Sequence, residues 1–360
     1  MFFLFNFRAF KIIKTLFLIL KIKTLNNNIE RSIIMKNKLL LTTAIASVAF
    51  AGSAFSETKI GGNLEQTFVA TSEDGSASTR GFGAEHNISL SASKDLDNGL
   101  TASYGTVLED GVADTHYLTV GTDTIKFSVA RDNGANLSSS AIPYIGDAVG
   151  TAINQLGAAT SNTLSDTDVH NYEHARIDVS AAGGTITLNY APQNSSTRPS
   201  DSGTSDVGES AHGMIYSGNL GVDGLKVLAG VQKSDGQGNN TEAKEKQIGV
   251  SYNFGQFTVA AETASQDNSA AVGSVTEHDT DSFAVSYAVN DNLSIGLYSI
   301  ETEETASGTT AADDEEIKMI QVGYNLGGLG LSFGYAEVEN ISHDAGTDGE
   351  QFQIRTIQKF

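Results

Sequence analysis

The sequence predicts an all-β fold, a transmembrane antiparallel β-barrel of about 16 strands. Apolar residues recur at every second position, which gives a strand one apolar and one polar face. In the stretch 248–254 these residues are Ile248, Val250, Tyr252 and Phe254. Short turns alternate with long polar loops between such stretches. The chain has no run of about 18 uncharged apolar residues, so it offers no candidate helical span.

The alternating stretches repeat at intervals of 35 and 37 residues, measured between Tyr252, Tyr287 and Tyr324. Each repeat is a strand, a tight turn, a second strand and a long polar loop. An even number of antiparallel strands, with short turns on one rim and long loops on the other, is typical of transmembrane barrels. The expected strands are 59–70, 81–94, 100–108, 115–121, 124–131, 171–181, 185–191, 211–218, 225–232, 246–254, 257–263, 281–289, 293–300, 317–326, 329–336 and 350–360.

Backbone hydrogen bonding is the reason to expect closure. In hydrocarbon every N–H and C=O group must be paired within the protein, so a membrane sheet must close on itself. A barrel of about 16 strands encloses water rather than a packed core. Its inner face can then be Ser, Thr, Asn, Gln and Gly, which fits a hydrophobic content of only 39%. Aromatic residues gather at the turn-side strand ends, as in an interfacial girdle: Tyr252, Phe254, Tyr287, Tyr324 and Phe360.

The first 56 residues differ in charge from the rest. They hold eight Lys or Arg and one Glu, whereas the remainder holds 14 basic and 42 acidic residues. A basic start at Met35, an apolar stretch 39–50 and small residues before Glu57 are typical of a secretory signal peptide. We therefore assign 35–56 to a signal peptide and 57–360 to the barrel. Residues 1–34 are interpreted as a non-native N-terminal extension, or alternatively as part of an unusually long leader.

The mature chain resembles a Gram-negative outer-membrane general-diffusion porin of the trimeric 16-stranded kind, most similar to the alphaproteobacterial type. The resemblance is carried by the export signal at 35–56, by the strand–turn–strand units through 248–336, and by a terminal strand with Phe352, Ile354 and Phe360. It implies a homotrimer in the outer membrane of a Gram-negative bacterium, in contact with lipids and lipopolysaccharide. The implied function is a water-filled channel for passive diffusion of small hydrophilic solutes and ions.

The longest predicted loop, 132–170, follows the fifth strand. The resemblance implies that this third loop folds into the barrel and narrows the pore. Its Pro143, Gly146 and Asp147 match the Pro-Glu-Phe-Gly-Gly-Asp stretch of enteric porins, with Tyr144 in place of the glutamate. Asp147 is then either a carboxylate of the constriction or the N-cap of a short helix, and both roles are compatible.

Such a pore carries basic residues on the wall opposite this loop, and the resulting field sieves solutes by charge. By the alternation of each strand, the basic residues Lys126, His174 and Arg176 point inward. The acids that point inward by the same rule are Glu65, Glu85 and Glu262. Arg131 lies at a strand end, where it could line the mouth of the pore. For each residue the alternative is a solvated lumen charge. The excess of acids predicts a weakly cation-preferring pore. The predicted constriction comprises Asp147, Tyr144, Arg131, Arg176, His174, Lys126 and Glu65.

A run of four acids, Asp313, Asp314, Glu315 and Glu316, is a candidate surface site for Ca²⁺ or Mg²⁺, because these ions prefer oxygen ligands. Divalent ions there could bridge to lipopolysaccharide phosphates. The alternative is a solvated charge run. We expect no other cofactor.

Composition excludes several other functions. Without cysteine the chain has no disulfide scaffold and no thiolate zinc site, and its acidity disfavours nucleic-acid binding. Two alternatives stay open: a secreted soluble β-protein (an adhesin or a propeller) and an outer-membrane barrel lipase. A propeller needs four strands per repeat, where this chain supplies two. A lipase needs an outward His–Ser pair, for which His86 and His116 have the parity. We expect no enzymatic activity.

Overall fold

The computed structural model describes eight stretches of the chain: 57–109, 112–131, 140–145, 173–192, 210–234, 243–268, 275–306 and 313–360. Residues 57–360 form one compact unit. The predicted extension 1–34 and signal peptide 35–56 lie outside the described residues. No helix within these stretches is long and apolar enough to span a bilayer.

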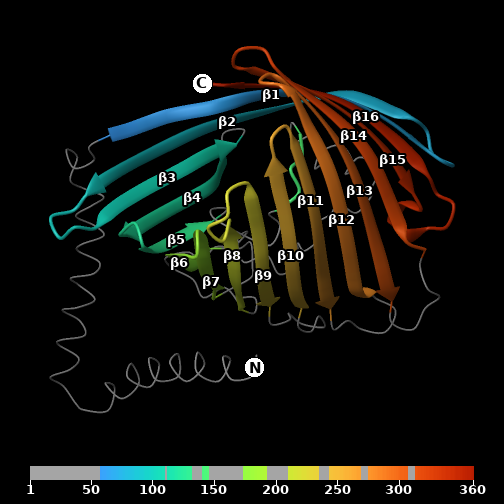
Figure 1. The fold of residues 1–360 in the computed structure, drawn as a ribbon. Coiled ribbons are helices and arrows are strands. Elements are labelled where there is room, and N and C mark those ends of the chain that lie inside the picture. The colour runs from blue at the N-terminus through green and yellow to red at the C-terminus, as the bar shows by residue number, and fades with distance from the viewer. Residues whose placement is uncertain are drawn as a thin grey trace. The chain divides into compact units, whose positions relative to one another are not determined.

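The described residues contain sixteen strands that close into an antiparallel barrel, in which each strand pairs with its neighbours in sequence and β1 pairs with β16 (Figure 1). Each expected strand overlaps one observed strand, so the predicted fold class and strand number are confirmed. The bounds are β1 Glu57–Glu73, β2 Thr79–Asp95, β3 Thr101–Glu109, β4 Val112–Gly121, β5 Ile125–Arg131, β6 His174–Ala181, β7 Gly184–Ala191, β8 Ala211–Gly218, β9 Leu225–Ser234, β10 Ala243–Phe254, β11 Phe257–Asn268, β12 Val275–Asn290, β13 Leu293–Ala306, β14 Glu315–Asn325, β15 Leu329–Glu339 and β16 Gly349–Lys359.

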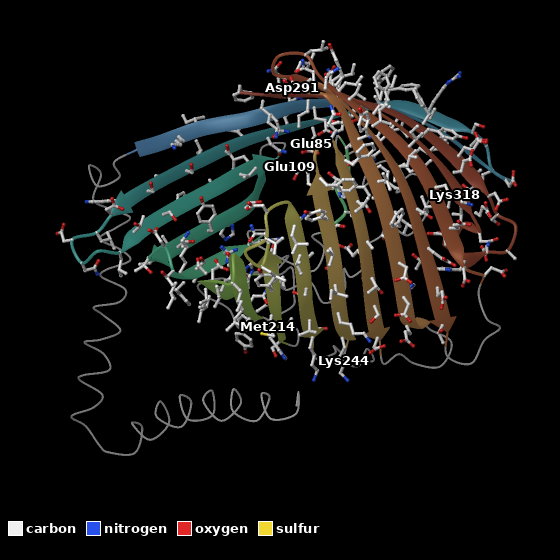
Figure 2. All side chains as sticks on the ribbon, in the orientation of Figure 1. Glu85, Glu109, Met214, Lys244, Asp291 and Lys318 are labelled. Carbon is white, nitrogen blue, oxygen red and sulfur yellow. The ribbon has the colours of Figure 1, made fainter. Side chains whose placement is uncertain are left out.

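Several strands, among them β10, β12, β13 and β15, are longer on the loop side than the sequence predicts. The expected strand 281–289 is the observed β12, which begins at Val275 and runs for 16 residues. A tilted strand needs only about 9–11 residues to cross the bilayer, so antiparallel pairing continues beyond the apolar stretch that the sequence pattern detects. Figure 2 shows the two rims, with Asp291 in the turn after β12 and Lys244 near the loop-side end of β10.

The outer face of the barrel is apolar. Large hydrophobic side chains project from alternate positions around the ring, which suits contact with hydrocarbon. At the turn-side rim, Phe257 stacks at 5.8 Å from Phe254 and contacts Tyr287 at 4.7 Å between ring centroids. This row is the expected interfacial girdle. Outward residues include Ile60, Phe82, Phe127, Ile177, Leu188, Met214, Ile248, Phe283, Leu297, Ile320 and Phe352.

The inner wall is partly apolar, which the sequence reasoning did not anticipate. Between β11 and β15 it carries an inner apolar patch of Ala260, Ala284, Tyr298, Ile300, Ile317, Met319, Ala336 and Val338. Two chain segments cover this patch, through Ile142 and through Ile341 of the short 3-10 helix η2 (Ile341–His343). The patch is therefore a small core between the wall and these segments, and it explains why a water-filled barrel buries large side chains.

The seam between β1 and β16 closes the ring. Gly62 and Phe360 exchange both backbone hydrogen bonds, each 3.1 Å long. A Cβ on Gly62 would overlap the carbonyl oxygen of Asn87 and press on the Phe360 ring, so the seam requires glycine there. On the inner face an ion pair joins Glu65 of β1 to Arg355 of β16, and both side chains are at least nine-tenths buried.

Candidate pore constriction

Residues 140–145 are the described part of the predicted in-folded loop, and they lie against the inner wall. Glu262 of β11 holds the start of this segment: its carboxylate accepts the backbone N–H of Ala141 at 2.6 Å and the hydroxyl of Ser140 at 2.9 Å. Lys226 of β9 donates to the carbonyl of Ser140 at 2.7 Å. A buried carboxylate and an ammonium group thus fix two consecutive residues of the loop to neighbouring regions of the wall.

The other end of the segment is held by β13 and β14. The N–H of Ile145 donates to Gln321 Oε1 at 2.8 Å and to the Tyr298 hydroxyl at 3.1 Å, and that hydroxyl donates to the carbonyl of Pro143 at 3.1 Å. The rings of Tyr144 and Tyr298 lie 5.2 Å apart. These bonds satisfy backbone groups of an irregular segment inside the barrel, where unpaired groups are costly.

Two glycines of the wall make room for the segment. A Cβ added to Gly249 of β10 would lie 2.6 Å from the Cβ of Ala141, and one added to Gly323 of β14 would lie 2.6 Å from a methyl carbon of Ile145. Both separations are below van der Waals contact. The wall is therefore shaped to the segment at both of its ends. In Figure 1 this segment is drawn in green behind β10 and β11.

The predicted basic wall lies on the other side of the ring. β5 and β6, which carry Lys126 and Arg176, stand eight positions from β13 and β14 in the 16-strand order. Lys126, Arg176 and Asp178 line one hollow of about 290 Å³. Arg176 donates to Asp178 at 3.0 Å, and Thr187 donates to the other oxygen of that carboxylate at 2.8 Å. Charged groups of both signs therefore line the inner wall on the side of the ring opposite β13 and β14.

The remaining predicted residues fall in three places. Glu65 lies on the inner face at the seam, bound to Arg355 and to the hydroxyl of Thr67 at 3.3 Å. His174 also faces inward, and its exposed fraction is 2%. Arg131 pairs with His116 in the register and shares the parity of Val129, which projects from the outer face. The register therefore sets Arg131 apart from the lumen residues. Asp147 lies outside the described residues, as does the helix it would cap.

The acidic run 313–316 does not gather its carboxylates. Glu315 is buried and accepts the N–H of Ser342 at 2.8 Å, whereas Glu316 has the opposite parity on β14 and pairs with Lys318 at 3.1 Å. The expectation of Ca²⁺ or Mg²⁺ at Asp313, Asp314, Glu315 and Glu316 stays a prediction. Among the described residues, the one group of three His or acidic side chains whose ligand atoms lie within 4.8 Å of one another is His278, Glu304 and His343.

Sequence reasoning placed Glu262 on the inner face but assigned no partner to it, and it missed Tyr298 and Gln321. Their contacts join residues more than 120 positions apart. A single clue was available: Tyr298 lies on the inner face of β13, where a large aromatic side chain needs a surface that covers it.

Comparisons with known proteins agree with this architecture. Residues 42–346 match the family described as Gram-negative porin. The anion-selective porin from Comamonas acidovorans superposes with a TM-score of 0.63 at 13% identity, covering 84% of this chain and 99% of that one. Outer-membrane expressed OmpT of Vibrio cholerae gives 0.59 at 12% identity, with 84% and 97% covered.

The trimer form of in-vitro folded OmpT from Vibrio cholerae gives a TM-score of 0.54 at 14% identity, with 84% of this chain and 99% of that one covered. No curated protein sequence matches the chain. The family match extends over most of the chain and includes the predicted loop 132–170. The chain belongs to the Gram-negative porin family.

Proposed function

We propose that this outer-membrane porin is a channel for small hydrophilic solutes and ions with a weak preference for cations, and that the segment 140–145 and the wall of β5 and β6 border its constriction. The general function follows from the family, whose members are diffusion channels without enzymatic activity. The preference for cations and the residues of the constriction are our inference from the charges on the inner wall.

The pairing of the inward bases supports the cation preference. Arg176 is joined to Asp178 and Arg355 to Glu65, so the charge of two inward arginines is offset by an adjacent carboxylate. Lys226 is bound to the loop backbone. The chain as a whole carries a net charge of −21. Where the positive charges of a lumen are neutralised by neighbouring carboxylates, the field of the other acidic residues attracts cations. One solved structure of similar fold is an anion-selective porin, so the shape of the barrel alone does not decide whether cations or anions are preferred.

The two alternatives from the sequence lose their basis. A soluble propeller or sandwich is contradicted by the closed ring of sixteen strands in the described residues. A lipase is contradicted by the family. A G-x-S-x-G sequence does occur at 330–334, but it lies within β15 rather than at a strand-to-helix turn, so Ser332 lacks the geometry of a nucleophile elbow.

The trimer is part of the proposal. Its support is the resemblance of the chain to trimeric porins and the trimer form of OmpT among the structures of similar fold. The same resemblance supports an alphaproteobacterial type. The start of the compact unit at Glu57 supports a signal peptide at 35–56 that is removed on export.

Reversal potentials across planar bilayers in a potassium chloride gradient test the selectivity. We expect a small potential of the sign that reports cation preference. A clear anion preference would contradict the proposal. Chemical cross-linking of the detergent-solubilised protein tests the trimer, for which we expect a ladder that stops at three chains.

A further inference from the structure

We propose that His278, Glu304 and His343 form a binding site for a divalent transition metal of the zinc class at the loop-side mouth of the barrel. Their ligand atoms all lie within 4.8 Å of one another. Two imidazoles and one carboxylate are a donor set that zinc uses where a fourth position stays open to water or a further ligand. This assignment is separate from the proposed constriction and involves different residues.

Three separate parts of the chain supply the ligands. His278 of β12 and Glu304 of β13 are directly opposite each other in the antiparallel register. Their parity is that of buried Thr280 and Thr302, so both face the inside of the barrel. His343 comes from η2, which packs on the inner apolar patch through Ile341. The ring centroids of His278 and His343 lie 6.0 Å apart.

The hydrogen bond made by Nδ1 of His343 leaves Nε2 of the same ring available to bind a metal. Its Nδ1 lies 3.0 Å from the carbonyl oxygen of Asp313, and because a carbonyl only accepts, Nδ1 carries the proton. In the neutral ring Nε2 then bears the lone pair. A backbone carbonyl on the second nitrogen is the common way in which proteins orient a metal-binding histidine.

The free nitrogen is buried and aimed at the cluster. The side chain of His343 is only 5% exposed, its Nε2 has no hydrogen-bond partner, and this atom lies 3.6 Å from Glu304 Oε2. Ligand atoms around tetrahedral zinc are roughly 3.3 Å apart, given metal–ligand distances near 2.0–2.1 Å. A small rotation of the side chains therefore brings the two donors to binding separation.

The segment that carries His343 is held firmly in place. The Ser342 N–H donates to the buried Glu315 carboxylate at 2.8 Å, and Asn340 Nδ2 donates to the carbonyl of Asp314 at 2.9 Å. Asn340, Ser342 and His343 all have positive φ values, between 53° and 62°. Such a conformation persists only where the surroundings impose it. The His343 ring is thus presented to β12 and β13 by a rigid support.

A proton is the rival occupant. If His343 were doubly protonated, its Nε2–H would pair with Glu304 as a simple ion pair, and no metal would be needed. Metal binding to the purified protein separates the two. The full chain in detergent would be titrated with Zn²⁺ by calorimetry in excess Mg²⁺ and Ca²⁺, which occupy sites made of oxygen alone. We expect one saturable Zn²⁺ per chain.

Variants locate that ion. H278Q, E304Q and H343Q should each weaken Zn²⁺ binding at least about tenfold. H116Q should not, although His116 also lies 3.0 Å from a glutamate, Glu173, because in the described residues that pair belongs to no group of three. Heat-modifiable migration on gels verifies that each variant forms the barrel. Unchanged binding in E304Q and H343Q would overturn the proposal.

A spectroscopic test needs no variant. Co²⁺ bound in place of Zn²⁺ should give the intense visible bands of a four- or five-coordinate ion with nitrogen and oxygen donors, and stoichiometric Zn²⁺ should remove them. If the wild-type protein shows only the weak spectrum of hydrated Co²⁺ and no saturable Zn²⁺ uptake, the three side chains hold no metal and the proposal is wrong.

Discussion

Glu262 of β11 binds Ala141 of the in-folded loop, with 2.6 Å between the carboxylate Oε2 and the backbone nitrogen, although the two residues are 121 positions apart in the sequence. The side chain of Glu262 is buried, and its second oxygen accepts the hydroxyl of Ser140. This carboxylate therefore helps to set the distance between the segment 140–145 and the wall.

Replacing Glu262 by Gln should loosen the loop. The amide offers one acceptor oxygen where the carboxylate offers two, and a hydrogen bond to a charged group contributes about 1.5–3 kcal/mol. We expect the released state of the segment to become at least about tenfold more populated, seen as frequent transitions to a higher level in single-channel recordings. E85Q is the control, because Glu85 is an inward acid on β2, away from the strands that hold the segment. Equal effects of both substitutions would contradict the anchoring role.

Adding a methyl group at Gly249 should displace the loop from the wall. The new Cβ would lie 2.6 Å from the Cβ of Ala141 and 2.5 Å from Glu262 Oε2. G323A meets a single methyl group, the γ2 carbon of Ile145, whereas G249A meets both a loop residue and the Glu262 carboxylate, so we expect a smaller change in conductance. Gly81 has no atom within 4 Å of its added Cβ, and G81A should conduct like the wild type. We expect the change in single-channel conductance to be largest in G249A, smaller in G323A and absent in G81A.

Removing the charge of Lys126 should increase cation preference. Its side chain is exposed in the hollow that it lines with Arg176 and Asp178, so K126Q removes a positive charge from the lumen. The reversal potential in a salt gradient should shift further toward cations, more strongly at low ionic strength, where screening is weaker. The matched control is K318Q, since Lys318 projects from the outer face of β14 (Figure 2). A shift of the same size in K318Q would refute a lumen effect.

Breaking the seam pair should destabilise the barrel. E65Q leaves the buried Arg355 guanidinium without its counter-charge, and loss of one partner from a buried pair costs about 3–5 kcal/mol. The folded, fast-migrating gel band should therefore disappear at lower temperature or urea concentration. E316Q removes a carboxylate from the solvent-exposed pair with Lys318 and should leave the stability of the barrel close to that of the wild type. Equal stability of E65Q and the wild type would show that the pair does not support the seam.

The fold was predictable from the sequence because its determinants are local. Alternation in stretches such as 248–254 and the recurrence of Tyr252, Tyr287 and Tyr324 specify strands, their number and their inward faces. Closure then follows from the requirement that backbone groups be paired in hydrocarbon. The strand ends were not predictable. Val275 and Glu277 of β12, for example, pair with residues of β13 in polar sequence that lacks the alternation of apolar residues.

The contacts of the site were less accessible to sequence reasoning. The alternation of side chains along each strand correctly predicted that Lys126, His174, Arg176 and Glu65 point inward, because successive side chains of a strand point to opposite faces of the sheet. It could not show that Glu262 binds Ala141, because such a contact depends on the path of a loop. His278 and His343 illustrate the same limit: they lie 65 positions apart, in no motif, and only the register of β12 with β13 and the turn after β15 bring them together.

The pairing of β1 with β16 has a consequence for biogenesis. Glu65 and Arg355 are 290 positions apart, so the ring can close only after the intervening polypeptide has been synthesised. Closure has an entropic cost, because it brings distant parts of the chain together. A truncated product would expose two unsatisfied sheet edges, which hydrocarbon does not tolerate. Shortening the gene should therefore abolish insertion altogether rather than yield a narrower pore.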